Sequence, residues 1–106
     1  MEIRLLVIDE ERNTIGIVGF FSALDMQKII EYAEENNLFC LQFISLTFDT
    51  HFNERQQHLI VKDLEVLRKQ DDLNKDILKM IADGLLIAKT DSFSQLKFEP
   101  MHAQKM

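Results

Sequence analysis

The chain has 106 residues, of which 46% are hydrophobic and 28% are charged, a length and composition typical of one packed domain. Twelve Lys and Arg residues against eighteen Asp and Glu give a net charge of −6, which disfavours direct contact with nucleic-acid phosphates. The sequence contains neither a membrane-length apolar run nor a signal-peptide pattern, so we expect a cytoplasmic protein that does not interact with membranes.

The beginning of the chain predicts a β-hairpin. Two short apolar runs, residues 3–8 and 15–20, are rich in branched aliphatic side chains and flank the polar segment 9–14. Gly16 and Gly19 weaken the second run as a strand and indicate a β-bulge or a close backbone approach.

A helix and a strand are expected next. Ser22 and Asp25 have the spacing of a capping box, in which Asp25 reaches back to the helix start, and the apolar spacing that follows predicts a helix over residues 23–36. Residues 38–48 are the most hydrophobic stretch of the chain, and we expect them to form a central strand covered on both faces at its start. Cys40, the only cysteine, should be a small buried side chain in this strand without a catalytic role.

The second half of the chain predicts a pair of helices. Asn53 and Gln56 again have capping-box spacing before an apolar stripe, and Asp71 and Asp72 suit the first turn of the next helix because acidic groups favour that end. The polar link between the two helices is short, so they should pack as an antiparallel pair.

The end of the last helix has two readings. Gly84 could terminate it and leave residues 85–88 as a strand, but the helical spacing of apolar residues continues, so we predict a helix to about Lys89. Residues 96–99 then form the final strand, which Pro100 should close.

These elements define a fold class. The order β-β-α-β-α-α-β has too few and too unevenly placed helices for a doubly wound parallel sheet, so we expect an α+β fold with a mostly antiparallel sheet and helices on one face. Residues 1–100 should form one domain, and residues 101–106 should be a flexible tail.

Two groups of residues could support chemistry. His51, Glu54 and His58 have the ligand types of a facial metal site, although their spacing matches no strong metal motif and polar residues are common where a strand meets a helix. Four carboxylates, at Asp71, Asp72, Asp76 and Asp83, could assist acid–base catalysis, but acidic residues also collect at helix starts. In both cases we favour the structural explanation, and we expect no catalytic residue, no bound metal and no cofactor.

Aromatic residues offer a different kind of site. Phe20, Phe21, Phe48, Phe52 and Phe93 are numerous for a small core. The simpler expectation is that they fill the core, whereas an exposed aromatic patch near acidic residues would indicate a protein interface.

The C-terminal half resembles a known family. The run 76–81, continued by the apolar residues 85–88 and by the sequence Ser-Gln-Leu-Lys-Phe-Glu-Pro at 94–100, is similar to the ending of small bacterial immunity proteins paired with contact-dependent growth-inhibition toxins. In those proteins paired helices precede a short strand that reads Leu-Lys-Phe or similar. The resemblance covers about thirty residues and includes no catalytic motif. Where an acidic residue commonly follows that strand, this chain has Pro100 and Met101.

This resemblance implies a function by binding. An immunity protein neutralises its cognate toxin, and many such toxins are nucleases with basic clefts that an acidic surface can occlude. The residues expected to contact a basic toxin are Asp9, Glu10, Glu11, Asp71, Asp72 and Asp76. Two other functions remain open at this point, namely a homo-oligomeric regulatory or adaptor domain and a small metal-dependent enzyme that uses His51, Glu54 and His58. Without its toxin, the chain is expected to be a monomer or a weak homodimer.

Overall fold

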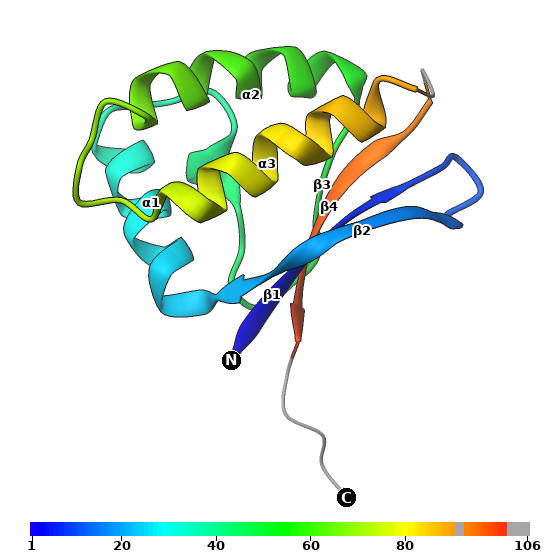
Figure 1. The fold of residues 1–106 in the computed structure, drawn as a ribbon, viewed down its shortest axis with the longest axis horizontal. Coiled ribbons are helices and arrows are strands. Elements are labelled where there is room, and N and C mark those ends of the chain that lie inside the picture. Colours follow the sequence, from blue (N-terminus) through cyan, green and yellow to red (C-terminus); the bar gives the residue numbers. More distant parts are fainter. Residues whose placement is uncertain (91–92, 102–106) are drawn as a thin grey trace, which may run out of the picture.

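The computed structural model describes residues 1–90 and 93–101 and consists of one four-stranded antiparallel sheet with three helices on one face (Figure 1). The elements are β1 (Glu2–Ile8), β2 (Thr14–Ser22), α1 (Ala23–Glu35), the 3-10 turn η1 (Leu41–Phe43), β3 (Thr50–Phe52), α2 (Glu54–Leu67), α3 (Lys75–Ala88) and β4 (Gln95–Met101). The predicted α+β class and the order of strands and helices are therefore confirmed. None of the helices in this part of the chain is both long enough and apolar enough to cross a bilayer.

The sheet has the strand order β2-β1-β4-β3, so the first and last strands of the chain form its centre. β1 pairs along its whole length with both neighbours, and Leu5, for example, lies opposite Gly19 on one side and Phe98 on the other. The short β3 pairs only with residues 96–98 of β4 and lies at the edge. The two ends of the chain therefore lie side by side in the sheet, because β1 gains its second neighbouring strand only when β4 pairs with it.

The hairpin prediction is confirmed, and both glycine effects occur. The pairing of β1 with β2 shifts register twice, so β2 holds one extra residue at each shift, beside Gly19 and beside Gly16. Helix α3 also passes close above these positions. A Cβ atom on Gly19 would lie only 2.9 Å from Met80 Sδ, which is closer than a side chain permits.

Helix α1 begins and ends where the sequence predicts, but its cap differs in detail. The Ser22 side chain accepts a hydrogen bond from the Leu24 amide at 3.1 Å. Asp25 does not complete a capping box, because its carboxylate accepts instead from the Asn74 side chain at 3.1 Å. At the other end Asn37 adopts a left-handed backbone with φ of 52°, a conformation that asparagine tolerates better than most residues.

The prediction of a central strand over residues 38–48 is wrong. These residues form an irregular segment with the 3-10 turn η1, and the third strand follows them as the three-residue β3 at the sheet edge. The buried side chains Leu38, Leu41 and Ile44 recur every third residue, which is the period of a 3-10 turn and not the period of two expected of a strand. The hydrophobic run was correctly located, but its period was misread.

The two long helices are confirmed, and the start of the second one is corrected. Helix α2 has a complete capping box, in which Asn53 accepts from the Gln56 amide at 3.0 Å and Gln56 accepts from the Asn53 amide at 2.8 Å. Helix α3 begins at Lys75 because the Asn74 side chain caps it. Asp71 and Asp72 therefore lie in the connection before the helix and not in its first turn.

Gly84 lies inside α3, which continues past it to Ala88, so the helical reading of residues 85–88 is correct. The glycine is needed for packing. A Cβ atom there would lie 2.8 Å from Leu96 Cδ1 and 3.4 Å from Val18 Cγ2, so only the absence of a side chain lets α3 approach the sheet this closely.

The last strand runs further than predicted. Pro100 does not end β4, since it pairs with Ile3 and Met101 pairs with Glu2. Proline is tolerated because β3 begins opposite Phe98 and runs away from Pro100, so at Pro100 the strand has a neighbour only on the β1 side. Met101 therefore belongs to the sheet and not to the predicted tail, and residues 102–106 lie outside the described residues.

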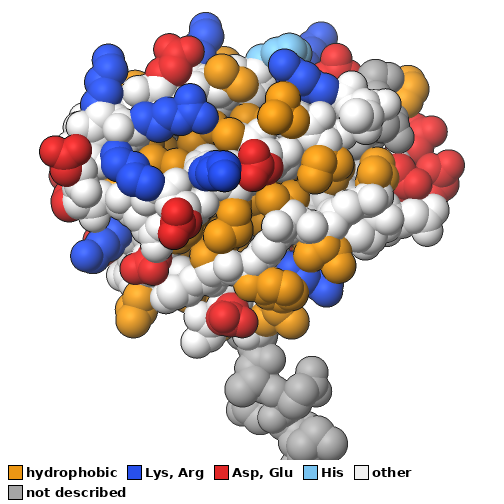
Figure 2. Space-filling model, in the orientation of Figure 1, with side chains coloured by type: hydrophobic (Ala, Val, Ile, Leu, Met, Phe, Trp, Pro, Cys, Tyr) orange, Lys and Arg blue, Asp and Glu red, His pale blue; other side chains and the backbone are white. Residues whose placement is uncertain are grey.

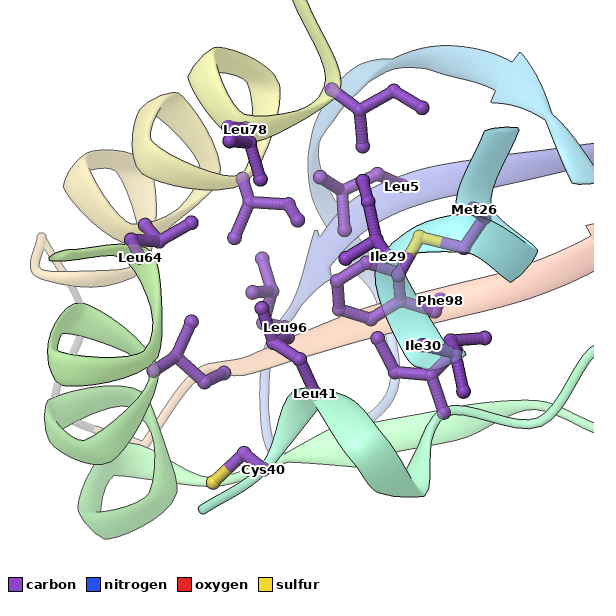
Figure 3. Packing of buried hydrophobic residues seen from close by; sticks show 14 of the residues in the cluster. Leu5, Met26, Ile29, Ile30, Cys40, Leu41, Leu64, Leu78, Leu96 and Phe98 are labelled. Atoms are coloured by element: carbon purple, nitrogen blue, oxygen red, sulfur yellow. The ribbon is translucent and has the colours of Figure 1, made fainter. Parts of the chain in front are cut away.

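The hydrophobic core fills the space between the sheet and the helices (Figure 3). Leu5 and Phe98 contribute from the two central strands, while Ile29 and Leu78 face them from α1 and α3. Phe21 and Phe52 pack edge-on against the ring of Phe98, at centroid distances of 6.4 and 5.8 Å.

Candidate protein-binding surface

The hairpin loop between β1 and β2 carries the first group of predicted binding residues. Asp9 shapes this loop, since its carboxylate accepts from the Asn13 amide at 2.8 Å and its carbonyl accepts from the Arg12 amide at 3.0 Å. Glu10 and Glu11 are exposed at the tip. Two of the three acidic side chains are thus displayed to solvent, and the third holds the loop in shape.

The second group lies in and after the connection between α2 and α3. Asp71 and Asp72 are exposed in that connection, and Asp76 is exposed in the first turn of α3. Asp72 also lines a shallow hollow together with Glu31 and Glu35 of α1. The fold therefore brings two acidic residues of α1 next to one member of the predicted group.

The structure does not unite these two groups. Figure 1 shows the β1–β2 loop and the α2–α3 connection at opposite ends of the longest axis, along which the Cα atoms extend over 39 Å. On the face in Figure 2, acidic side chains gather at the hairpin end, while elsewhere acidic and basic side chains alternate. A single interface that used all six predicted residues would have to extend over the full length of the molecule.

The alternative metal triad is not assembled. His51 lies in edge strand β3, whereas Glu54 and His58 line a cleft of about 140 Å³ between α2 and α3. Within residues 1–90 and 93–101, no three side chains of the His, Cys, Asp or Glu type converge in a geometry that could hold a metal ion. His51 and the pair Glu54 and His58 thus belong to neighbouring elements, β3 and α2, but the three side chains do not converge on one point.

The open face of the sheet carries a chain of ion pairs. Arg4 Nε donates to Glu99 Oε1 at 2.7 Å, and Lys97 Nζ lies 3.3 Å from Glu99 Oε2 and 3.5 Å from Asp49 Oδ2. Burial alone would raise the pKa of Glu99, but hydrogen bonds from Arg4 and Lys97 and their charges lower it overall. The pKa of His51 is lowered by burial and by the charge of Lys97. This network ties β1, β4 and the β3 edge together.

A buried carboxylate organises the segment that follows α1. Asp63 of α2 is fully buried and accepts three backbone hydrogen bonds, from Phe39 at 2.8 Å, Cys40 at 2.8 Å and Leu41 at 2.9 Å. Three amides that point at one carboxylate replace the water that an ionised group loses on burial. Asp63 therefore fixes the backbone of residues 39–41 against α2.

Cys40 is buried beside this carboxylate, and its thiol points towards α2 (Figure 3), where it donates to the Gln56 carbonyl at 3.5 Å. Burial, reinforced by the negative charge of Asp63, raises the pKa of the Cys40 thiol to about 11. The thiol therefore stays protonated at neutral pH, and its predicted role as a small buried side chain is confirmed.

The rest of the segment is held by its own polar side chains. The Gln42 side chain donates to the Leu38 carbonyl, and the Ser45 amide donates to Thr50 Oγ1 at 3.0 Å. Ser45 Oγ accepts from the Phe48 amide at 3.0 Å. We call residues 38–49 the aromatic loop, and these bonds together with Asp63 give it a defined shape without a regular strand ladder.

The aromatic loop turns its large rings outward. Phe39, Phe43 and Phe48 are 55%, 66% and 76% exposed, although they lie in the most hydrophobic stretch of the sequence. The Lys62 ammonium lies 5.9 Å from the centroid of the Phe39 ring, within the range of a cation–π contact. Between these rings, the side chains of Cys40, Leu41 and Ile44 are buried instead.

Exposed aromatics are a general feature of this chain. The phenylalanines with large exposure are Phe20, Phe39, Phe43, Phe48 and Phe93, and the buried ones are Phe21, Phe52 and Phe98. The expectation that Phe20, Phe21, Phe48, Phe52 and Phe93 fill the core is therefore correct for Phe21 and Phe52 and wrong for the other three. A single exposed ring is unremarkable, but three exposed rings on one constrained loop make this loop a candidate for protein recognition.

Sequence reasoning missed this surface because residues 38–48 were interpreted as a strand covered on both faces at its start. The three-residue period of Leu38, Leu41 and Ile44 was an available signal, since it leaves Phe39 and Phe43 on the other side of the turn. The role of Asp63 had a weaker signal, namely an acidic residue within the apolar stripe of α2.

No protein-family model matches this chain, and comparisons with curated proteins and with solved structures found no match.

Proposed function

We propose that this protein binds a basic, nuclease-like protein toxin and neutralises it by occluding the active site, as an immunity protein of the contact-dependent growth-inhibition type does. The proposal combines the sequence resemblance over residues 76–100 with a net charge of −6 and an exposed aromatic surface. A bacterial cytoplasmic location and the absence of an enzymatic activity of its own belong to the same proposal.

The observation that carries the proposal is the exposure of three phenylalanine rings on the aromatic loop. Leaving an aromatic side chain in water forgoes roughly 1.5–3 kcal/mol of burial free energy for each ring, and binding can recover it. Large aromatic anchors in a desolvated centre supply most of the energy of many protein interfaces.

The defined shape of the loop supports the same function. Asp63 holds residues 39–41, and side-chain bonds around Ser45 hold the next turn. A loop that is ordered before binding loses less conformational entropy when the complex forms. This preorganisation favours slow release of the partner.

The acidic groups have a separate task in this proposal. Glu10 and Glu11 lie at the hairpin end, where acidic side chains gather and form a negative region that attracts a basic partner over distance. Asp71 and Asp72 are exposed at the other end, among basic side chains. Such charges mainly accelerate association, whereas the aromatic anchors govern dissociation.

The test is capture of the partner and measurement of its activity. Immobilised protein should retain a basic protein from lysate of the source cell at low salt, form a one-to-one complex with the purified partner and abolish the partner's nuclease activity. The association rate should fall steeply as salt is raised, because screening weakens attraction between exposed charges. A partner that remains fully active in the complex, or an association rate that does not respond to salt, would contradict the proposal.

A matched charge variant sharpens this experiment. Replacing Glu10 and Glu11 by glutamine removes two exposed charges without touching the Asp9 hydrogen bonds that shape the loop. The association rate should fall and the dissociation rate should stay nearly constant. As the control, Glu65→Gln removes one exposed charge from the outer side of α2.

A further inference from the structure

The two edges of the sheet differ sharply. At one side β3 offers only three residues, whereas at the other side β2 presents nine, Thr14–Ser22. Proteins usually protect long edge strands with charged side chains or proline, since unpaired backbone groups there can pair with another chain. Residues 14–22 contain no charged residue and no proline, although 28% of the chain is charged.

The surroundings of this edge are apolar on both faces of the sheet. On the open face Ile17 and Phe20 are 56% and 46% exposed. On the helix face Met80 and Ile87 of α3 are half-buried and contact the β2 glycines. Figure 2 shows hydrophobic side chains gathered along α3 and β2, so the unpaired edge runs through an apolar band.

The regular part of β2 is the stretch that can receive another strand. Its two register shifts lie before Gly19, and from Gly19 to Ser22 the strand pairs residue by residue with Leu5 to Glu2 of β1. The bulges bend the first half of the edge, but the second half keeps the spacing of a normal ladder. Phe20 projects from the centre of this stretch, opposite Arg4.

We propose that two copies of the chain associate through this stretch of β2, which pairs antiparallel about a two-fold axis at Phe20, so that Phe20 of one copy lies opposite Phe20 of the other and both sheets join into one. An isologous contact places the same residues on both sides, so an uncharged strand inside an apolar band complements itself. The basic partner of the proposed function would be attracted by the acidic residues and held by the aromatic loop, and neither includes residues 19–22. The dimer is thus independent of toxin binding.

Salt dependence separates this dimer from binding of a basic partner. Each copy carries a net charge of −6, and the acidic hairpin loop directly precedes β2. Two like-charged copies repel one another, so added salt should tighten the dimer. Salt should have the opposite effect on association with a basic protein.

Sedimentation equilibrium of the full chain over a range of concentrations tests the dimer. The wild type should show a monomer–dimer equilibrium that tightens between about 0.05 M and about 0.5 M salt. Phe20→Glu should weaken dimerisation by at least about tenfold, because it places like charges next to each other at the axis. Within a monomer the new carboxylate faces Arg4, so the fold should tolerate it.

Val61→Glu is the matched control, since Val61 lies on α2 and is 44% exposed, close to the 46% of Phe20. It should leave the dimerisation constant within about twofold of the wild type, because Val61 is not part of the proposed contact. A wild type that stays monomeric up to about 1 mM overturns the proposal. A dimer that Phe20→Glu does not weaken overturns it as well.

Hydrogen exchange tests the dimer with the wild-type protein alone, so its result does not depend on whether a variant folds. The amides of residues 19–22 that face away from β1 should become protected as the protein concentration rises, since only the dimer pairs them. Protection that appears only after a different protein is added would assign the edge to that partner and refute self-association.

Discussion

Asp63 shows how one residue decides the shape of a surface. An ionised carboxylate is costly to bury unless hydrogen bonds replace its lost hydration, and here three amides of residues 39–41 provide them. The same bonds stop residues 39–41 from entering the sheet, because their amides are already used. The exposure of Phe39 and Phe43 is a consequence of this arrangement.

Asp63→Ala should therefore destabilise the fold by about 2–4 kcal/mol, since it leaves buried amides without an acceptor. Urea denaturation of the variant measures this change. Glu65→Ala, at an exposed position two residues further along α2, should alter stability by less than about 0.5 kcal/mol. Equal effects of the two substitutions would show that the buried carboxylate is not the anchor of the aromatic loop.

Glu99 makes the stability of the sheet depend on pH in a defined direction. Its pKa is lower in the folded protein than the ordinary value of 4.5, so at acid pH the unfolded chain takes up the proton more readily. The stabilisation is complete above pH 4.5 and is lost as the pH falls below that value towards the folded-state pKa.

Glu99→Gln tests this pH dependence. The variant should be less stable than the wild type at neutral pH, and the difference should shrink as the pH falls below 4.5. Urea denaturation at a series of pH values measures both curves. If the two curves stay parallel through the acid range, the ion pairs of Glu99 with Arg4 and Lys97 do not contribute to stability.

At the scale of elements, local signals in the sequence predicted most of the fold. The capping box of Asn53 and Gln56, the glycine pattern of β2 and the apolar spacing across Gly84 each act within a few residues, so a sequence alone contains them. The 38–48 segment was mispredicted for the opposite reason. Its conformation depends on Asp63, more than twenty positions away along the chain, and no local pattern reports that contact.

Gly84 is the element-scale position with the clearest consequence for packing. Leucine there should lower stability by about 2–3 kcal/mol or more, because its side chain would overlap Leu96 and Val18 where α3 crosses the sheet. Alanine should have a smaller effect, since its better helix propensity offsets part of the overlap. Thermal denaturation measures these changes, with Asp83→Ala at the neighbouring exposed position as control. A Gly84→Leu protein as stable as the wild type would show that the contact is not tight.

For the whole molecule, the sequence predicts a binding protein, and the structure places the predicted contact residues in two separate regions. Charge can be counted without a fold, and the acids of the hairpin loop are exposed as expected. Their distance from the α2–α3 connection, and the outward rings of the aromatic loop, depend on how distant segments pack. The proposed binding surface therefore differs from the one predicted from the sequence more than the fold does.

The dissociation rate of the complex with the captured basic partner tests the central claim most directly. Phe43→Ala and Phe48→Ala should each raise it by at least about tenfold, whereas Leu86→Ala, which removes a 62% exposed apolar side chain from α3, should change it by less than about twofold. Dissociation rates of both phenylalanine variants that equal the wild-type rate would contradict the account, because the aromatic loop would then contribute nothing to binding.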